Sequence, residues 1–145
     1  MRIQKADDKA VQEIMGMIHR TMHEGTMGHL PEEGEKASNL VQQVLDKGAY
    51  FLAAQEEDDL AGWVLFGTNV DYFTDAHHAF IYDIYVLEKY RGRGLARKLV
   101  MEAMKEGRRQ GAKEIRLNVF AGNPARKLYE EIGFDEFNIL MSKNL

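Results

Sequence analysis

Two glycines and three arginines lie close together in the second half of the chain. Residues 91–96 read Arg-Gly-Arg-Gly-Leu-Ala, and Arg97 follows directly. Glycine permits a tight turn and a close backbone approach to a ligand, and the free N–H groups at the start of a helix attract anions. The segment therefore predicts either a phosphate-binding turn or a tight turn that only needs small residues. It lacks the Gly-Lys-Ser/Thr ending of a nucleoside-triphosphate loop and the third glycine of a dinucleotide fingerprint.

Three side chains outside this turn could move protons. Asp83 interrupts an apolar segment, where its carboxylate could orient a cationic amine or accept its proton through water. His78 is the competing base, since an imidazole can take up a proton near neutral pH. Tyr129 carries a phenol, which stays protonated at neutral pH and can donate. Each also has a structural interpretation: an ion-paired aspartate, a surface histidine and a core tyrosine.

A histidine pair raises the question of a metal. His19 and His23 are four residues apart, which places both on one face of a helix, as chelation requires. No third ligand stands at a fixed spacing from them, although His29 is close. We therefore predict no metal site.

Composition limits the class of protein. The chain has 145 residues, a net charge of −4 and no cysteine. A cysteine nucleophile, a thiolate zinc site and a disulfide are thus excluded, and the acidic balance disfavours nucleic-acid binding. No apolar run has the length of a membrane span, and residues 1–8 lack the apolar core of a signal peptide. We expect a cytoplasmic protein that uses neither nucleic acid nor membrane as a partner.

Hydrophobic periodicity predicts the elements that position these residues. Strands are expected over residues 2–5, 50–54, 60–66, 78–86, 115–120 and 134–141, and helices over 11–22, 37–45, 96–110 and from Asn123-Pro124 to Gly133. The order favours an α/β fold, with one mixed sheet covered by helices on both faces. We expect a single domain over residues 1–145.

Two segments resemble signatures of the GNAT family of N-acetyltransferases. Residues 81–96 are similar to its central motif, whose phosphate loop Gln/Arg-x-x-Gly-x-Gly/Ala is matched by Arg91, Gly94 and Ala96. Residues 123–134, Asn-Pro-Ala-Arg-Lys-Leu-Tyr-Glu-Glu-Ile-Gly-Phe, resemble its second signature. The order of elements matches along essentially the whole chain. The resemblance implies a GNAT-like fold, whose mostly antiparallel sheet contains one parallel pair of strands that splay apart.

The resemblance also implies acetyl-CoA as co-substrate. The pyrophosphate would lie on the backbone N–H groups of the glycine turn, and the pantetheine arm would pair with the preceding strand like an added strand. A backbone N–H near Val86 would polarise the thioester carbonyl. The residues carried over for cofactor binding are Ile84, Tyr85, Val86, Arg91, Gly92, Arg93, Gly94, Leu95, Ala96 and Asn123.

Catalytic roles follow from the same resemblance. Tyr129 matches the tyrosine that protonates the departing CoA thiolate. Asp83 lies where the polyamine branch of the family has a carboxylate, whereas other branches carry their base further upstream, nearer His78. Asp83 and His78 therefore both stay candidates for the base.

We predict an N-acetyltransferase that moves an acetyl group from acetyl-CoA to a primary amine by direct attack in a ternary complex. The alternative is a non-catalytic acyl-CoA-binding or regulatory module on the same fold, which would need neither Tyr129 nor Asp83. The acceptor would be shaped by residues 21–35 and 69–77, with Tyr72, Phe73, His23 and His29 as lining. Acidic residues in these segments favour a small cationic amine, such as a polyamine, amino sugar or peptide amine. A homodimer is left open.

Overall fold

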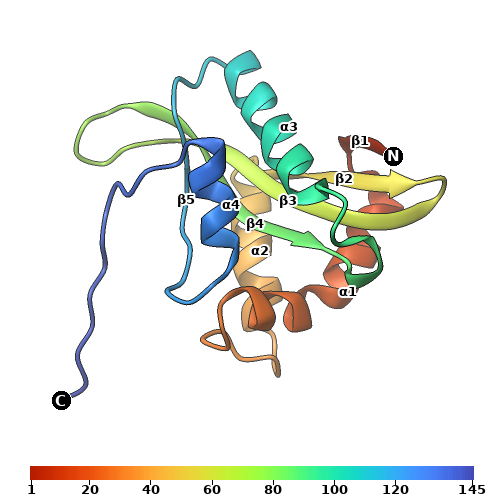
Figure 1. Ribbon diagram of the computed structural model, residues 1–145, viewed down its shortest axis with the longest axis horizontal. Coiled ribbons are helices and arrows are strands. Elements are labelled where there is room, and N and C mark those ends of the chain that lie inside the picture. Colours follow the sequence, from red (N-terminus) through yellow and green to blue (C-terminus); the bar gives the residue numbers. More distant parts are fainter.

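The computed structural model describes all 145 residues, which form one five-stranded sheet with helices on both faces (Figure 1). The strands lie side by side in chain order: β1 (Arg2–Lys5), β2 (Tyr50–Glu56), β3 (Asp59–Val70), β4 (His77–Val86) and β5 (Ile115–Leu117). Neighbours are antiparallel except for β4 and β5, which are parallel. The predicted α/β fold with one parallel pair in a mostly antiparallel sheet is confirmed.

Four helices divide between the two faces of the sheet. α1 (Asp8–Gly25) and α2 (Lys36–Asp46) pack on one face, and the side chains that meet there include Ile14, Ile18, Val41, Trp63 and Leu65. α3 (Leu95–Arg109) and α4 (Ala125–Ile132) pack on the other, around Val64, Phe66, Leu99, Val100 and Tyr129. Each helix contributes one apolar stripe and leaves its polar face in water, which is why the sequence periodicity predicted them.

A bulge divides β4 into two parts. Leu65 of β3 lies opposite Asp83 and Phe66 lies opposite Ile81, so Tyr82 between them has no partner. An extra residue bends a strand and turns the following side chains. As a result Ile81 packs with the α3 side of the sheet, whereas Tyr82 and Tyr85 pack with the α1 side.

The parallel pairing of β4 and β5 ends at the same point. The two strands are in register only from Ala79 opposite Ile115 to Ile81 opposite Leu117. Beyond Ile81, β4 keeps β3 as its neighbour and loses β5, so the strands part. The short 3-10 turn η1 (Glu88–Tyr90) then leads β4 into α3.

The chain after α4 does not form the predicted strand. Residues 134–141 contain no strand. β5 ends at Leu117, whereas the sequence predicted that this strand would continue to Phe120. The last backbone hydrogen bond of the chain runs from the Phe134 N–H to the Tyr129 carbonyl. An alternating sequence makes a strand only where a neighbouring strand supplies hydrogen bonds, and this segment has none (Figure 1).

None of the helices is both long and apolar enough to span a bilayer. The cytoplasmic location stays a prediction.

Candidate active site

The glycine turn presents a row of unused backbone donors at the end of β4. The N–H groups of residues 92–97 donate to no acceptor within the protein. Gly92 has φ of 80° and Gly94 has φ of 74°, backbone conformations that favour glycine. A Cβ at either position would meet no other atom within 4 Å, so the space beside the turn is open. Such a row, at the N-terminus of the 15-residue helix α3, suits a phosphate or pyrophosphate.

The arginines of this region already have carboxylate partners. The ion pairs are Arg91–Glu24 at 3.1 Å, Arg93–Glu56 at 3.8 Å and Arg97–Glu131 at 3.0 Å. All six side chains are roughly half exposed, so each pair contributes little stability and can give way to a stronger anion. Arg91 has a further role, because its Nε donates to the Val86 carbonyl at 2.9 Å and ties the turn to the end of β4.

Asp83 follows the bulge directly and has no cationic partner. Its carboxylate accepts a 2.8 Å hydrogen bond from the indole N–H of Trp63. Burial raises the pKa of the Asp83 carboxyl to about 6, against the lowering effect of the Trp63 and Ile84 N–H groups. A carboxyl with this pKa can accept a proton near neutral pH, which an ordinary surface aspartate does poorly.

Tyr129 of α4 approaches the place where β4 and β5 part. Its side chain is 93% buried, yet its hydroxyl forms no hydrogen bond within the protein. Burial, and to a lesser degree the charge of Asp83, raises the pKa of the Tyr129 phenol to about 12. Tyr129 packs in the same cluster as Ile84 and Val86 of β4. The raised pKa means that the phenol keeps its proton at any working pH.

The edge of β4 beside this gap is open. Residues 83–86 pair with β3 on one side and with no strand on the other. Ile84, Tyr85 and Val86 lie on this stretch, next to the glycine turn. An open strand edge, an anion-binding turn, a carboxyl with a raised pKa and an unpaired phenol are thus brought together.

Comparison with known proteins agrees with this geometry. Residues 12–134 match the model of the acetyltransferase (GNAT) family. The chain belongs to this family. The family prediction is thereby confirmed, and with it the enzyme class, an acetyltransferase. Among curated relatives, the uncharacterized N-acetyltransferase YycN of Bacillus subtilis (strain 168) is 39% identical over 90 residues, which cover 61% of this chain and 56% of YycN.

Solved GNAT structures share the fold over the full chain. A Pyrococcus furiosus protein assigned as an acetyl transferase has a TM-score of 0.83 and 27% identity, covering 99% of this chain and 100% of its own. The aminoglycoside N-acetyltransferase AAC(6')-Iy, solved in complex with CoA, has a TM-score of 0.72 and 17% identity, covering 99% of this chain and 98% of its own. At that identity the second likeness shows the fold alone.

Asn123 links the family's second signature to α1. Its side-chain N–H donates to the Gly25 carbonyl at 3.0 Å, and its Oδ1 accepts from the Ala125 N–H at 2.9 Å, which starts α4. His29 stacks on Phe120 with ring centroids 4.8 Å apart. The loop after α1 therefore contacts the loop before α4. The assignment of Asn123 to the cofactor arm stays a prediction.

The residues predicted to line the acceptor site differ in exposure and in the contacts they already make. Tyr72 and Phe73 are about 90% exposed at the tip of the β3–β4 hairpin. Asp71 lies beside Arg116 of β5, and this guanidinium holds the pKa of the Asp71 carboxyl well below its usual range. Its charge is thus already neutralised. The Nδ1–H of His23 donates to the Leu30 carbonyl, 2.9 Å away, and shapes the loop after α1.

His78 lies apart from the other candidate residues. It occupies the first half of β4, is 4% exposed, and its Nδ1 is 3.3 Å from the Ala76 carbonyl. Five residues along a strand span about 16 Å, so His78 is far from Asp83. The structure brings Asp83, and not His78, to the opening.

No metal-binding arrangement accompanies the histidine pair on α1. No group of three or more histidine, cysteine, aspartate or glutamate side chains is gathered as a metal would require.

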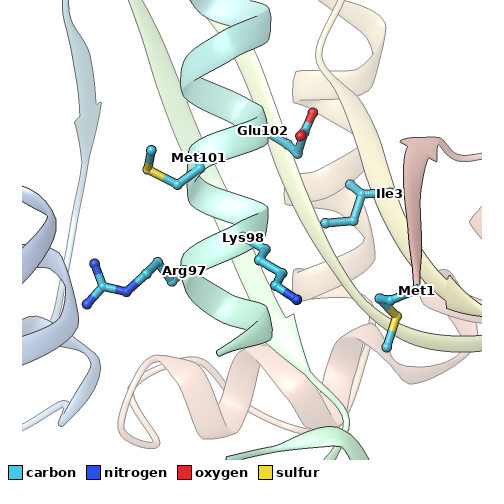
Figure 2. A pocket seen from close by; sticks show the side chains of 6 residues that line it. All are labelled: Met1, Ile3, Arg97, Lys98, Met101 and Glu102. Atoms are coloured by element: carbon cyan, nitrogen blue, oxygen red, sulfur yellow. The ribbon is translucent and has the colours of Figure 1, made fainter. Parts of the chain in front are cut away.

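Two hollows flank the glycine turn. A cleft of about 730 Å³ lies between α1 and the end of β4, and its lining includes Arg20, Glu24, Tyr85 and Arg91. A hollow of about 380 Å³ lies between α3 and β1, where Lys98 and Glu102 point from α3 toward β1 (Figure 2). The first hollow adjoins the candidate site, whereas the second opens at the opposite edge of the sheet from β5.

The sequence analysis missed Trp63, and it placed Glu24 only among the acidic residues of segment 21–35, without its contacts. Trp63 is the only side chain that donates to Asp83, and its ring stacks on Tyr85 with centroids 5.3 Å apart. Glu24 accepts from the Tyr85 hydroxyl at 2.8 Å and pairs with Arg91, so α1 is fastened to the end of β4. The pairing of β3 with β4 could have suggested Trp63, because Trp63 is the register partner of Tyr85. Nothing in the sequence links Glu24 to Arg91.

Proposed function

We propose that this chain transfers the acetyl group of acetyl-CoA to a primary amine by direct attack in a ternary complex. One observation carries the proposal. The unpaired N–H groups of residues 92–97 adjoin a strand whose open half bears Asp83, and Tyr129 packs against Ile84 and Val86 of that half. The absence of cysteine supports direct transfer, since no thiol exists to hold the acetyl group.

The residues present fit acetyl-CoA. The N–H groups of residues 92–97 would hold the pyrophosphate, with Arg93 and Arg97 able to leave their exposed partners for it. Amides of the pantetheine arm would pair with the open edge of β4, as a peptide adds to a sheet. A backbone N–H near Val86 would then lie beside the thioester oxygen and stabilise the charge that develops on it.

Asp83 would prepare the acceptor. An ammonium group must lose a proton before its nitrogen can attack the thioester carbon, and Asp83 would take this proton directly or through water. Because burial raises the pKa of the carboxyl to about 6, the ionised form is present at neutral pH and yet can be protonated. The C–N bond forms as the C–S bond breaks.

Tyr129 would supply the proton to the leaving thiolate. The charge of Asp83 is one of the two causes that raise the pKa of the Tyr129 phenol. When Asp83 accepts the proton of the amine, this charge disappears and the phenol becomes a better acid. The two proton transfers would therefore favour each other.

The charge of the neighbourhood supports a cationic acceptor. Glu32 and Glu33 lie in the exposed loop after α1, and Asp83 lies on the open half of β4 without a cationic partner. Asp71 and Glu24 do not add to this negative charge, because Arg116 and Arg91 pair with them. We infer a small cationic amine, such as a polyamine, an amino sugar or a peptide amine.

A CoA-release assay with a panel of amines tests the proposal. Release that depends on a cationic primary amine, and that falls in Asp83→Asn and Tyr129→Phe, is expected. The competing function, a non-catalytic acyl-CoA-binding module, would give CoA binding by calorimetry without release for any amine. A matched panel of the corresponding alcohols serves as the control, since they lack the positive charge and the ammonium proton that Asp83 would bind and remove.

A further inference from the structure

We propose that Trp63 is a positioning residue for Asp83: its indole N–H holds one oxygen of the carboxylate and leaves the other oxygen to the acceptor amine. The inference rests on the proposed function, which makes Asp83 the base of the reaction. Trp63 lies on β3, outside both segments that carry the family signatures, residues 81–96 and 123–134. It is therefore a part of the site that those signatures do not include.

The contact between the two residues crosses from β3 to β4. Trp63 is the register partner of Tyr85, and Asp83 lies two residues before Tyr85, on the same side of the sheet. A long aromatic side chain can reach such a diagonal neighbour. The indole Nε1 donates to Asp83 Oδ2 at 2.8 Å, whereas no side chain donates to Oδ1. Oδ1 is also not enclosed, so this oxygen can accept a proton from an amine or a water.

The indole ring is itself held in place. Trp63 is fully buried and packs with Leu65 in the cluster under α1. Its ring stacks on Tyr85, with centroids 5.3 Å apart and 28° between the planes, and the Tyr85 hydroxyl donates to Glu24 of α1 at 2.8 Å. A donor whose ring is locked by packing orients its acceptor more strictly than a mobile side chain does. The direction of the Asp83 carboxylate is thus fixed through β3 and α1.

The protonation of Asp83 depends on the same donor. Burial raises the pKa of the Asp83 carboxyl to about 6, and the Trp63 N–H opposes burial more strongly than the Ile84 N–H does. A hydrogen bond to the ionised form favours that form. Loss of the indole N–H should therefore raise the pKa of Asp83 further and leave less carboxylate at neutral pH.

No charged side chain shares this role with the indole. Three charged groups at this end of the sheet influence the pKa of the Tyr85 phenol and not that of the Asp83 carboxyl: Arg20, Glu24 and Arg91. On β3, the register partner of Asp83 is Leu65, which does not ionise. On α4, the Tyr129 phenol is coupled to Asp83 but keeps its proton.

The single tryptophan of the chain makes the contact visible without background. In proton NMR spectra of the wild type, the one indole N–H resonance should move with pH around a midpoint of about 6, because the hydrogen bond strengthens when its acceptor ionises. Asp83→Asn should abolish this movement, and His78→Gln should leave it. An indole resonance that does not move, or that moves equally in Asp83→Asn, would overturn the proposal.

Replacement of Trp63 by benzothienylalanine tests its effect on the reaction. This amino acid keeps the bicyclic shape and has sulfur in place of the N–H, so it avoids the cavity that Trp63→Phe would leave. The pH at which kcat/KM rises should move upward by about one unit or more. At pH 6 kcat/KM should therefore fall by about fivefold or more, and it should recover as pH rises above the new midpoint.

Phe51→Leu is the matched control for packing. Phe51 is also fully buried, in the same cluster as Trp63, and it donates no hydrogen bond to Asp83. Its substitution should lower stability and leave the midpoint of the pH–rate profile in place. A loss of kcat/KM that is equal at every pH in the benzothienylalanine protein would show that Trp63 only packs, and would overturn the proposal. If the wild type releases CoA with no amine, the proposed function fails, and the indole titration still decides whether Trp63 holds Asp83.

Discussion

The two halves of β4 have similar sequences and opposite surroundings. Residues 77–81 pair with β3 on one side, and residues 79–81 also pair with β5 on the other, whereas residues 83–86 pair with β3 alone. Each half contains aromatic side chains and groups that could act as a base, His77 and His78 in the first and Asp83 in the second. The first half is closed by its neighbours. The second opens toward Tyr129 and the glycine turn.

The difference arises from one extra residue. Tyr82 is unpaired in the ladder with β3, and the parallel ladder with β5 stops at the residue before it. A strand that bends here keeps its hydrogen bonds to one neighbour and frees its other edge for a ligand. A titratable group gains access to substrate only in the freed half, which favours Asp83 over His78 as the base.

The largest effect, on CoA affinity, is expected in the glycine turn that follows the open half of β4. Gly94→Glu should lower CoA affinity by about 10²-fold or more, because it places bulk and negative charge where the pyrophosphate would bind. Gly111→Glu is the matched control: Gly111 has φ of 89° and equally open surroundings at the other end of α3. Calorimetry of both folded variants measures the effect. Equal CoA affinity in the two would remove the glycine turn from the site.

Tyr129→Phe tests the group that faces the open half. Removing the hydroxyl while keeping the ring should lower kcat by around 10²-fold, within the usual range for a general acid. Acetyl-CoA affinity and stability should hardly change, since the hydroxyl has no partner within the protein. Tyr50→Phe, which removes a hydroxyl that is hydrogen-bonded to Glu106 far along the sheet, should leave kcat intact. Full activity of Tyr129→Phe would make this tyrosine a core residue only.

Asp83→Asn should lower kcat/KM for a cationic acceptor by roughly 10–150-fold, the loss of one charge-assisted contact. In the wild type, kcat/KM should rise with pH and level off above the pKa of about 6 of the Asp83 carboxyl. The variant should lose this rise. Steady-state rates between pH 5 and pH 8 measure both. A silent variant with an unchanged pH profile would contradict the role of Asp83.

The Asp83→Asn substitution should raise the free energy of unfolding at neutral and alkaline pH, although it lowers activity. Burial raises the Asp83 pKa from 3.8 to about 6, so the folded protein holds this proton more tightly than the unfolded chain. The cost of ionisation is absent below about pH 4, grows as pH rises, and is complete above about pH 6, where it reaches about 3 kcal/mol. Asp83→Asn should therefore raise the free energy of unfolding at pH 8, and the gain should vanish at pH 4.

Urea unfolding at the two pH values checks this expectation. Asp58→Asn, in the exposed turn between β2 and β3, is the matched control and should change stability little at either pH. A gain in Asp83→Asn that is the same at pH 4 and pH 8 would show that its cause is packing and not ionisation.

The smallest effect on activity is expected in the first half of β4, residues 77–81. His78→Gln should change kcat/KM by less than about threefold, because its side chain is enclosed between neighbours and far from the opening. The pH–rate profile of this variant is the measurement. Should it flatten while that of Asp83→Asn keeps its shape, the base belongs to the first half of β4 and the comparison of the two halves fails.

Local patterns were enough to predict most of the elements and the residues of the turn. The helical stripes, the apolar strands over 50–54 and 60–66 and the two glycine-containing signatures depend on neighbours in sequence. These patterns did not predict on which side of the sheet each β4 side chain lies. Strict alternation would put Ile81, Asp83 and Tyr85 on one side of the sheet, but the bulge at Tyr82 moves Ile81 to the other.

Periodicity, glycine content and motif spacing are local properties of the chain, and they were enough to predict the fold class, the family and the glycine turn. Contacts between distant segments settle three further features: which titratable group lies in the open half of β4, what Asp83 contacts and whether residues 134–141 form a strand. These outcomes depend on groups far apart in sequence: Trp63 across a register shift, Tyr129 on α4, and a neighbouring strand, which residues 134–141 do not have beside them. A hydrogen bond or a desolvated carboxyl exists only once such partners have been brought together.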